Sequence, residues 1–300
     1  MRAIDHNTIT DAAIEQMATT PNPRLREVME ALVRHLHAFA REVDLTPEEW
    51  LEGIKFLTAV GQKCTPIRQE FILLSDTLGL STLVNSLHDR RAVELGTKTS
   101  LLGPFYRQDS PLLPLGESIV ESPRQQVLLY GRVTDTHGNP LPHASVEVWQ
   151  TDEDGAYDLQ RENATEMDMR GRFQADAQGN YYFRTVPPLG YMIPLDGPVG
   201  ALVLSQKRHG YRPAHIHFLI GAPGHRELVT ALYLSDDTHL ESDTVFGVTD
   251  SLVVTLREND PEAPLKGLPA IRFDFRLATA KDDAMGRVGA DPAQITRVGA

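Results

Sequence analysis

A pair of histidines on an expected strand is the feature of this chain best suited to binding a metal. The segment from Arg212 to Ile220 ends in an apolar run that is typical of a buried strand. Successive side chains leave opposite faces of a strand, so His215 and His217 are predicted to share one face and to reach one ion. Pro213 favours a strand start, which places the pair near the end of a sheet. The spacing alone does not distinguish a metal site from hydrogen-bonded core histidines.

Two tyrosines in long loops are the second chemical feature. Tyr157 follows Asp-Gly-Ala, and Tyr191 follows Leu-Gly. Because the pKa of tyrosine is about 10, a phenolate forms at neutral pH only beside a strongly Lewis-acidic cation. Ferric iron meets this requirement far better than zinc. A lone tyrosine is more commonly a core ring with a hydrogen-bonded hydroxyl, so the iron hypothesis requires both tyrosines to converge on the histidine pair.

The order and spacing of Tyr157, Tyr191 and the Arg-Pro-Ala-His-Ile-His run resemble the intradiol ring-cleaving dioxygenases. The segment Leu102-Gly103-Pro104-Phe105-Tyr106 is similar to the Gly-Pro segment at the entry to that family's catalytic domain. The first hundred residues resemble the dimerisation domain of the catechol and hydroxyquinol 1,2-dioxygenases, so the resemblance covers most of the chain.

The resemblance implies one Fe(III) per chain and insertion of both atoms of O2 into a catechol-type ring. The implied metal ligands are Tyr157, Tyr191, His215 and His217. Tyr191 is implied to be catalytic as well, because it would leave the metal and accept a substrate proton. Arg212 is the second implied catalytic residue, since a fixed cation there would stabilise negative charge on the ring. The alternative for Arg212 is a salt bridge at the rim.

One departure from the family pattern concerns the strand that follows the histidines. The family often carries a glutamine there as a partner of the arginine, whereas this chain is expected to carry Ala231. Either the register is shifted or another group orients Arg212.

The substrate is expected to be set by Asp76. Leu73 and Asp76 lie three apart on an expected helix and share a face. The corresponding helix of the catechol enzymes carries proline where Asp76 stands. A buried carboxylate needs a partner, and a third ring hydroxyl would be one. The alternative is an aspartate on the helix surface or at its cap. The full set of expected pocket residues is Leu73, Asp76, Leu101, Pro104, Phe105 and Val245.

The best interpretation is therefore a hydroxyquinol (1,2,4-trihydroxybenzene) 1,2-dioxygenase that forms maleylacetate. A first alternative keeps the iron but cleaves catechol or chlorocatechol to cis,cis-muconates. A zinc hydrolase is a second alternative, although no Glu or Asp has the spacing of a third ligand and tyrosine is a poor zinc ligand. A third is a non-enzymatic sandwich that binds a partner, because sandwiches host many functions.

The elements that must position these residues differ between the two parts of the chain. Apolar residues recur every three or four positions between Leu25 and Val43, which predicts an amphipathic helix. Thr46-Pro47-Glu48-Glu49 predicts the start of a second helix, with a capping box. A third is expected from Gln69 to Leu87, with Gly79 inside it.

From about Val127 the pattern changes to short strands separated by turn residues, which predicts an antiparallel sandwich. The predicted strands are 127–136, 144–149, 181–186, 216–220, 228–234, 251–256 and 271–277. The segments 151–170 and 187–211 are expected to be irregular and functional. The fold class is thus α+β, with a helical dimerisation domain over 1–105 and a β-sandwich catalytic domain over 106–300 that ends in a flexible tail.

Composition excludes several classes of function. A net charge of -12 without a dense basic run argues against a nucleic-acid surface. The single cysteine, Cys64, excludes an intramolecular disulfide framework and fits a reducing compartment. No apolar run is long enough for a membrane span and no signal peptide is recognised, so a cytoplasmic protein is expected. The apolar helical stripe predicts a homodimer, and the resemblance implies that an apolar groove between such helices holds a lipid.

Overall fold

The computed structural model describes residues 4–65, 68–89, 96–121, 125–161 and 166–280. The described residues up to Thr58 form one compact unit, and those from Ala59 onward form a second. The tail that the sequence predicts to be flexible begins after Ala278, and most of it lies outside the described residues. Among those residues, no helix is long and apolar enough to cross a membrane.

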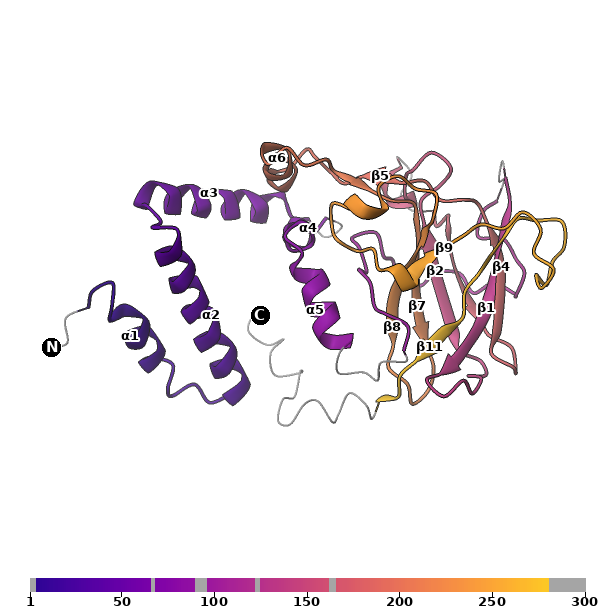
Figure 1. Cartoon of the computed structure of the whole chain (residues 1–300), viewed down its shortest axis with the longest axis horizontal. Helices are drawn as coiled ribbons and strands as arrows, with labels where there is room; N and C mark the ends of the chain where they lie inside the picture. The colour runs from indigo at the N-terminus through magenta and orange to yellow at the C-terminus, as the bar shows by residue number, and fades with distance from the viewer. Residues whose placement is uncertain (1–3, 66–67, 90–95, 122–124, 162–165, 281–300) are drawn as a thin grey trace. The chain divides into compact units, whose positions relative to one another are not determined.

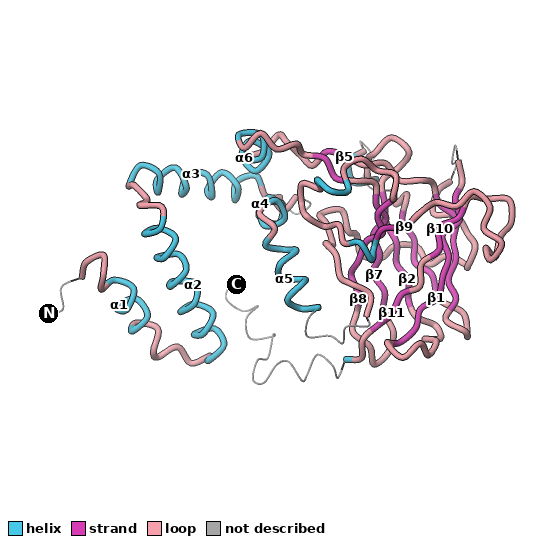
Figure 2. The backbone as a smooth tube through the Cα atoms, in the orientation of Figure 1, coloured by secondary structure: helices cyan, strands magenta, loops and turns pink. Residues whose placement is uncertain are grey.

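Helices make up the first unit. They are α1 (Ile9–Glu15), α2 (Pro23–Glu42) and most of α3 (Pro47–Lys63). The predicted capping box opens α3: the Thr46 backbone N–H donates to Glu49, and the Glu49 N–H donates to the Thr46 hydroxyl. α1 lies beside α2 (Figure 2), where Arg41 donates a hydrogen bond of 2.7 Å to the Thr10 hydroxyl.

The helix expected from Gln69 to Leu87 is in fact two helices, so that prediction was wrong in its continuity. They are α4 (Glu70–Thr77) and α5 (Leu80–Asp89). The break falls at Gly79, whose φ of +74° is a left-handed conformation that glycine adopts without steric cost. The separate α4 buries Leu73 and Asp76 together, as the spacing predicts.

The strands of the second unit form two main sheets. One has the order β3-β2-β7-β8-β9, and in the other β10, β11 and β4 all pair with β1. β5 and β6 form a separate two-stranded ribbon. Figure 1 shows the strands of the two main sheets side by side. The strands are β1 (Val127–Asp135), β2 (Ser145–Gln150), β3 (Arg170–Gln174), β4 (Asn180–Thr185), β5 (Tyr191–Met192), β6 (Tyr211–Arg212), β7 (His215–Gly221), β8 (Leu228–Leu234), β9 (Val253–Val254), β10 (Ala270–Arg272) and β11 (Phe275–Leu277).

The predicted fold class is confirmed, with one correction to the pairing. The sheets are mixed rather than purely antiparallel, because β10 and β11 run parallel to β1, and β9 runs parallel to β8. Parallel neighbours need a crossover: the connection 235–252 joins β8 to β9, and the chain passes through the other main sheet between β1 and β10. The run 271–277 is also split into two short strands at Phe273-Asp274.

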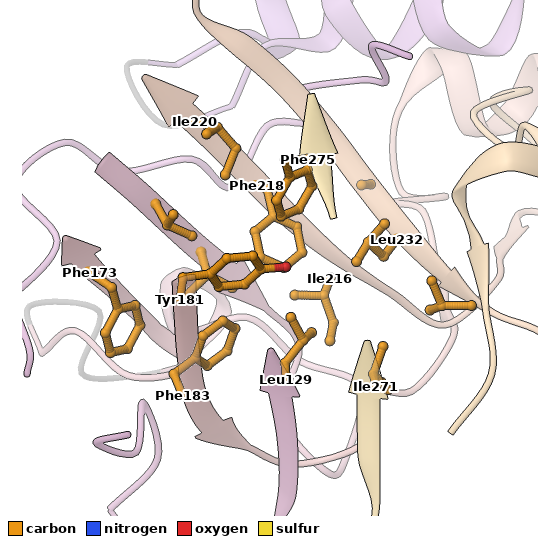
Figure 3. Packing of buried hydrophobic residues seen from close by; sticks show 14 of the residues in the cluster. Leu129, Phe173, Tyr181, Phe183, Ile216, Phe218, Ile220, Leu232, Ile271 and Phe275 are labelled. Carbon is orange, nitrogen blue, oxygen red and sulfur yellow. The ribbon is translucent and has the colours of Figure 1, made fainter. Parts of the chain in front are cut away.

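The core fills the space between the two sheets. Leu129 of β1, Phe183 of β4 and Phe275 of β11 pack there against Ile216 and Phe218 of β7 (Figure 3). These β7 residues point into the core, so the alternating residues His215, His217 and Leu219 leave the opposite face. The strand therefore anchors the two histidines through Ile216, which lies between them, and Phe218, which follows His217.

The segments expected to be irregular contain short elements that the sequence did not predict. The first holds a 3-10 helix, Asp158–Gln160, and ends at the start of β3. The second holds β5 and the helix α6 (Pro198–Ser205), which buries Val199 and Val203. Two further 3-10 helices, Leu240–Ser242 and Asp250–Leu252, follow β8.

Candidate active site

The two histidines lie where the strand period predicts. His215 and His217 are each 1% exposed, and their Nε2 atoms are 3.1 Å apart. Burial and the charge of Arg212 hold the pKa of both imidazoles well below the usual range, so both rings are neutral at pH 7. The Nδ1 atom of His215 lies 2.6 Å from the carbonyl oxygen of Pro213 and donates to it. The Nε2 of His215 therefore carries the lone pair that a metal requires.

Both predicted tyrosines converge on this pair. Tyr157 is fully buried, and its hydroxyl lies 3.4 Å from Nε2 of His215. The rings of Tyr157 and Tyr191 meet edge to face, with centroids 5.5 Å apart. Burial, followed by the neighbouring Tyr191, raises the pKa of Tyr157 well above its usual value of 10.0. Tyr157 is thus a neutral phenol unless a strongly Lewis-acidic cation binds beside it.

This donor set fits a ferric ion better than zinc. Two neutral imidazole nitrogens and two phenol oxygens meet in a buried space, and phenolates are ligands for a hard, highly charged cation. Among the described residues, no group of three or more His, Cys, Asp and Glu side chains could hold a metal. The usual zinc donor set is therefore incomplete in the part of the chain that the structure describes.

Arg212 is buried against the same four residues rather than exposed at a rim. Its Nη1 atom lies 3.1 Å from Nε2 of His215 and 3.4 Å from the hydroxyl of Tyr191. Burial opposes the guanidinium charge, but Asp243 and Tyr191 outweigh that effect and raise the pKa of Arg212 well above its usual value. The cation is therefore permanent, and one edge of it faces the tyrosine and histidine donors.

The partner of Arg212 is not a residue that sequence reasoning identified. Ala231 stands opposite His217 in the β7–β8 register, so a methyl group occupies that position of the strand. Arg212 is held instead by Asp243, at 3.3 Å and 3.4 Å, and by the hydroxyl of Tyr233, at 3.4 Å. The strand period could have found Tyr233, because it lies two residues after Ala231 and opposite His215. Asp243 lies outside regular strands, where no sequence pattern marks it.

Sequence reasoning also missed the groups that fix the Tyr157 loop. Asp158, next in the chain, is buried and forms an ion pair with Arg170 of β3. Arg107 also donates to Asp158, at 3.1 Å. Arg170 donates in addition to the backbone carbonyl of Phe105, at 3.2 Å from both of its Nη atoms. One buried guanidinium thus ties the tyrosine loop to the Gly-Pro segment.

The Gly-Pro segment lies beside the tyrosine and histidine donors. The ring of Phe105 stacks on Tyr157 with centroids 4.3 Å apart. A side chain at Gly103 would lie 3.4 Å from the His217 ring. Pro104 is half-buried between these neighbours. On the other side of His217, the Trp149 ring stacks at 5.0 Å.

The remaining predicted pocket residues come from α4 and from the loop after β8. Asp76 is 5% exposed, and burial raises the pKa of its carboxyl. The hydrogen bond from Ser81 and the charge of Arg212 act to lower that pKa, whereas the charge of Asp243 acts to raise it. Asp76 is thus buried within electrostatic range of Arg212, not on the helix surface. Leu73 is buried on the same helix, and Val245 is 2% exposed beside Asp243.

Comparison with known proteins gives matches over most of the chain. The family described as Dioxygenase matches residues 104–279, and Catechol dioxygenase N terminus matches 22–96. A 6-chlorohydroxyquinol 1,2-dioxygenase from Cupriavidus pinatubonensis is 43% identical over 92% of this chain and 99% of its own length. An intradiol ring-cleavage dioxygenase from Aspergillus niger is 43% identical over 100% of this chain and 92% of its own.

Solved structures lead to the same family. The structure of a hydroxyquinol 1,2-dioxygenase from Pseudomonas putida has a TM-score of 0.83 and 43% identity, and it covers 91% of this chain and 98% of its own. Membership of this family implies a non-haem iron cofactor and oxidation of a catechol-type substrate by O2. The fold, the converging tyrosines and histidines, and both halves of the match lead to one conclusion: the chain belongs to the intradiol ring-cleaving dioxygenases.

Proposed function

We propose that this enzyme cleaves hydroxyquinol between its first two hydroxyl-bearing carbons and forms maleylacetate. The observation that carries the substrate assignment is the buried carboxylate of Asp76, within electrostatic range of Arg212. A third ring hydroxyl can donate a hydrogen bond to this carboxylate, whereas catechol would leave it without a ligand partner. The names of the relatives from Cupriavidus and Pseudomonas support the same substrate class.

We further propose one Fe(III) per chain, held by Tyr157, Tyr191, His215 and His217. The support is the meeting of their donor atoms in a buried space, together with the neutral state of both imidazoles. When bound, the ferric ion supplies the Lewis acidity and the redox chemistry by which a ring diol reacts with O2. The zinc and binding-module alternatives give no account of two buried phenols at this point.

The protein groups then perform four tasks. Tyr191 accepts a substrate proton at its Oη atom, because a phenolate is a base. Arg212 faces that oxygen and stabilises negative charge that develops on the ring. Phe105 covers Tyr157 and excludes water from the site. Asp76 binds the third hydroxyl and so orients the ring.

The substrate assignment is tested by kcat/KM for hydroxyquinol, catechol and a chlorocatechol, measured as oxygen uptake. We expect hydroxyquinol to be preferred, and we expect Asp76→Leu to lower that preference by 10-fold to 100-fold, about the value of one lost hydrogen bond to a charged group. Asp76→Asn is the matched control, since it keeps a hydrogen-bond acceptor and should retain part of the preference. A wild-type preference for catechol would replace the hydroxyquinol assignment with the catechol alternative.

We propose that a second copy of the chain covers the apolar row of α2. Val28, Leu32, Leu36, Phe39 and Val43 recur at spacings of three and four and are all exposed. Light scattering should give twice the mass of one chain, and the double variant Leu32→Lys, Leu36→Lys should reduce it to one. Organic extraction followed by mass spectrometry tests the further proposal that a lipid occupies the groove between such helices.

A further inference from the structure

Arg212 uses the two edges of its guanidinium for different partners. The edge formed by Nε and Nη2 faces the carboxylate of Asp243, at 3.3 Å and 3.4 Å. The remaining nitrogen, Nη1, faces His215 and Tyr191. A planar guanidinium held along one edge by a carboxylate has its plane fixed, so the direction of the other edge is fixed as well. The Asp243 carboxylate thus determines where the free edge points.

Asp243 is itself held in place by its own loop. The backbone N–H of Gly247 donates to Oδ2 at 2.9 Å, and that of Val245 donates to Oδ1 at 3.3 Å. Between them Phe246 adopts a φ of +58°, which is uncommon for a residue with a side chain. Asp243 is 5% exposed. A buried carboxylate that receives two backbone hydrogen bonds and a guanidinium has little freedom to move.

The absence of a side chain at Gly247 is required by this arrangement. A Cβ atom there would lie 2.6 Å from the Tyr233 hydroxyl, 3.0 Å from Nη2 of Arg212 and 3.1 Å from Oδ2 of Asp243. The loop backbone therefore packs directly against the ion pair. The Ser100 hydroxyl closes the far side, at 2.9 Å from the Tyr233 hydroxyl and 3.2 Å from the Gly247 carbonyl oxygen.

The neighbouring strand offers no other polar group to orient Arg212 at the position opposite His217. Ala231 occupies that position and carries only a methyl group. Tyr233 is the next residue of β8 on that face, and its hydroxyl receives a single contact of 3.4 Å from Nη2. The contacts of Asp243 are more numerous and are charge-assisted, so the carboxylate carries the larger part of the positioning.

We propose that Asp243 is the positioning residue for Arg212 in ring cleavage, with the Tyr233 hydroxyl as a secondary support. The inference rests on the proposed function, because it assigns a role within that reaction. Asp243 does not face the substrate side of the guanidinium, so its loss should leave binding of the ring diol largely intact. It should lower the rate of the step in which Arg212 stabilises charge. We therefore expect a fall in kcat with little change in KM.

A double-mutant cycle in the iron-loaded full-length enzyme tests this role. We expect Asp243→Ala to lower kcat by about 10²-fold, the scale at which small misplacements of catalytic groups act. In an Arg212→Met background the same substitution should have no further effect, because there is no guanidinium left to position. Asp243→Asn keeps one acceptor oxygen, so its kcat should lie between those of the wild type and Asp243→Ala.

Asp260 provides a matched control in the loop before β10, where it contacts Tyr130 of β1. It is a buried carboxylate that accepts from the hydroxyl of Tyr130 at 2.9 Å, pairs with Arg257 at 3.6 Å and receives the Glu262 N–H at 3.0 Å. Asp260→Ala therefore removes the same kinds of contact without touching Arg212. It should leave kcat within about 3-fold of the wild type, the range of small independent effects.

A second readout separates positioning from loss of the site. Iron content and the visible absorption band should be retained in Asp243→Ala and Asp243→Asn, and anaerobic hydroxyquinol should still shift the band. The inference would be overturned if Asp243→Ala lowered kcat by the same factor in the Arg212→Met background as in the wild type. It would also be overturned if both Asp243 variants kept the kcat of the wild type. If Asp243→Ala does not fold, Asp243→Asn and Tyr233→Phe carry the same cycle. A wild-type enzyme with neither iron band nor turnover would instead refute the proposed function.

Discussion

The Nε2 atoms of His215 and His217 lie 3.1 Å apart. Burial lowers the pKa of both rings, so neither imidazole carries a charge. The proton of His215 is on Nδ1, where the Pro213 carbonyl accepts it, so its Nε2 directs a lone pair toward its neighbour. This nitrogen, Nε2 of His217 and the two buried phenols beside them form a donor set that suits a shared cation. The strand thus holds the imidazoles in a geometry that favours metal binding.

Removal of either tyrosine hydroxyl tests this donor set. We expect Tyr157→Phe to lose most of the bound iron and the visible band, because a buried phenyl ring offers no ligand. Tyr191→Phe should lower kcat by at least about 10²-fold, since it also removes the proton acceptor. Iron analysis, absorption spectra and oxygen uptake measure these effects.

Tyr181 is the control for both variants. It is also a buried tyrosine, and it donates to the Phe273 carbonyl oxygen at 2.9 Å. Tyr181→Phe should keep iron, colour and turnover. Equal iron loss in Tyr181→Phe and Tyr157→Phe would show that the effect is structural and would contradict the ligand assignment.

Loss of the buried ion pair between Arg170 and Asp158 should lower the unfolding free energy much more than loss of an exposed pair. Arg170→Met leaves the Asp158 carboxylate buried, and breaking a buried pair in this way costs about 3–5 kcal/mol of unfolding free energy. Arg107 remains as a second partner and favours the lower end of that range. The same change releases the Phe105 carbonyl, so iron should dissociate faster in the presence of a chelator.

Arg161 offers the matched comparison, because its side chain is 40% exposed while it pairs with Asp152 and Asp168. Arg161→Met should cost no more than about 1 kcal/mol. Urea unfolding of both variants measures the difference. Similar losses from Arg161→Met and Arg170→Met would count against the anchoring role of Arg170.

Asp76 should make stability depend on pH. Burial raises the pKa of its carboxyl above the usual 3.8, so the folded chain binds this proton more tightly than the unfolded chain. The unfolding free energy therefore falls as pH rises from the unfolded pKa through the folded pKa. Asn does not titrate, so Asp76→Asn removes this fall in unfolding free energy. The unfolding free energy of the variant relative to the wild type should therefore increase over that pH window and then level off. Urea titrations of iron-free protein at several pH values would contradict this if the difference were constant.

Gly190 should tolerate no side chain. A Cβ atom there would lie 2.7 Å from the backbone oxygen of Arg212 and 2.9 Å from Asp237, where β5 pairs with β6. Gly190→Ala should cost about 1–3 kcal/mol and displace Tyr191, with a weaker visible band as the result. Gly221→Ala is the control, because nothing lies within 4 Å of the added atom. Thermal unfolding and absorption spectra that do not distinguish the two would refute this account.

Local periodicity was sufficient to predict how the two histidines are placed. The alternation of His215 and His217 with Ile216 predicts both the strand and the shared face, and the resemblance supplies the two tyrosines. The same reasoning could not find Asp243 or Arg170. Each acts through a contact with a residue far away in the chain or in a loop, and no period links the members of such a pair.

Local elements of the fold were predictable from the sequence, whereas long-range pairings were not. Strand β8 agrees with its predicted bounds, and the capping box of α3 is present. The parallel pairing of β10 with β1 depends on a long crossover that local sequence does not encode. The break at Gly79 was missed because glycine inside a helical pattern predicts either a tolerated residue or a helix end.

The visible absorption spectrum of the purified enzyme, taken with an iron assay, tests the central claim most directly. We predict about one iron per chain and a broad visible band from phenolate ligation to a ferric ion. Anaerobic addition of hydroxyquinol should shift that band to longer wavelength, and should do so at lower concentration than catechol. A protein that binds no iron after reconstitution and stays colourless would contradict the account.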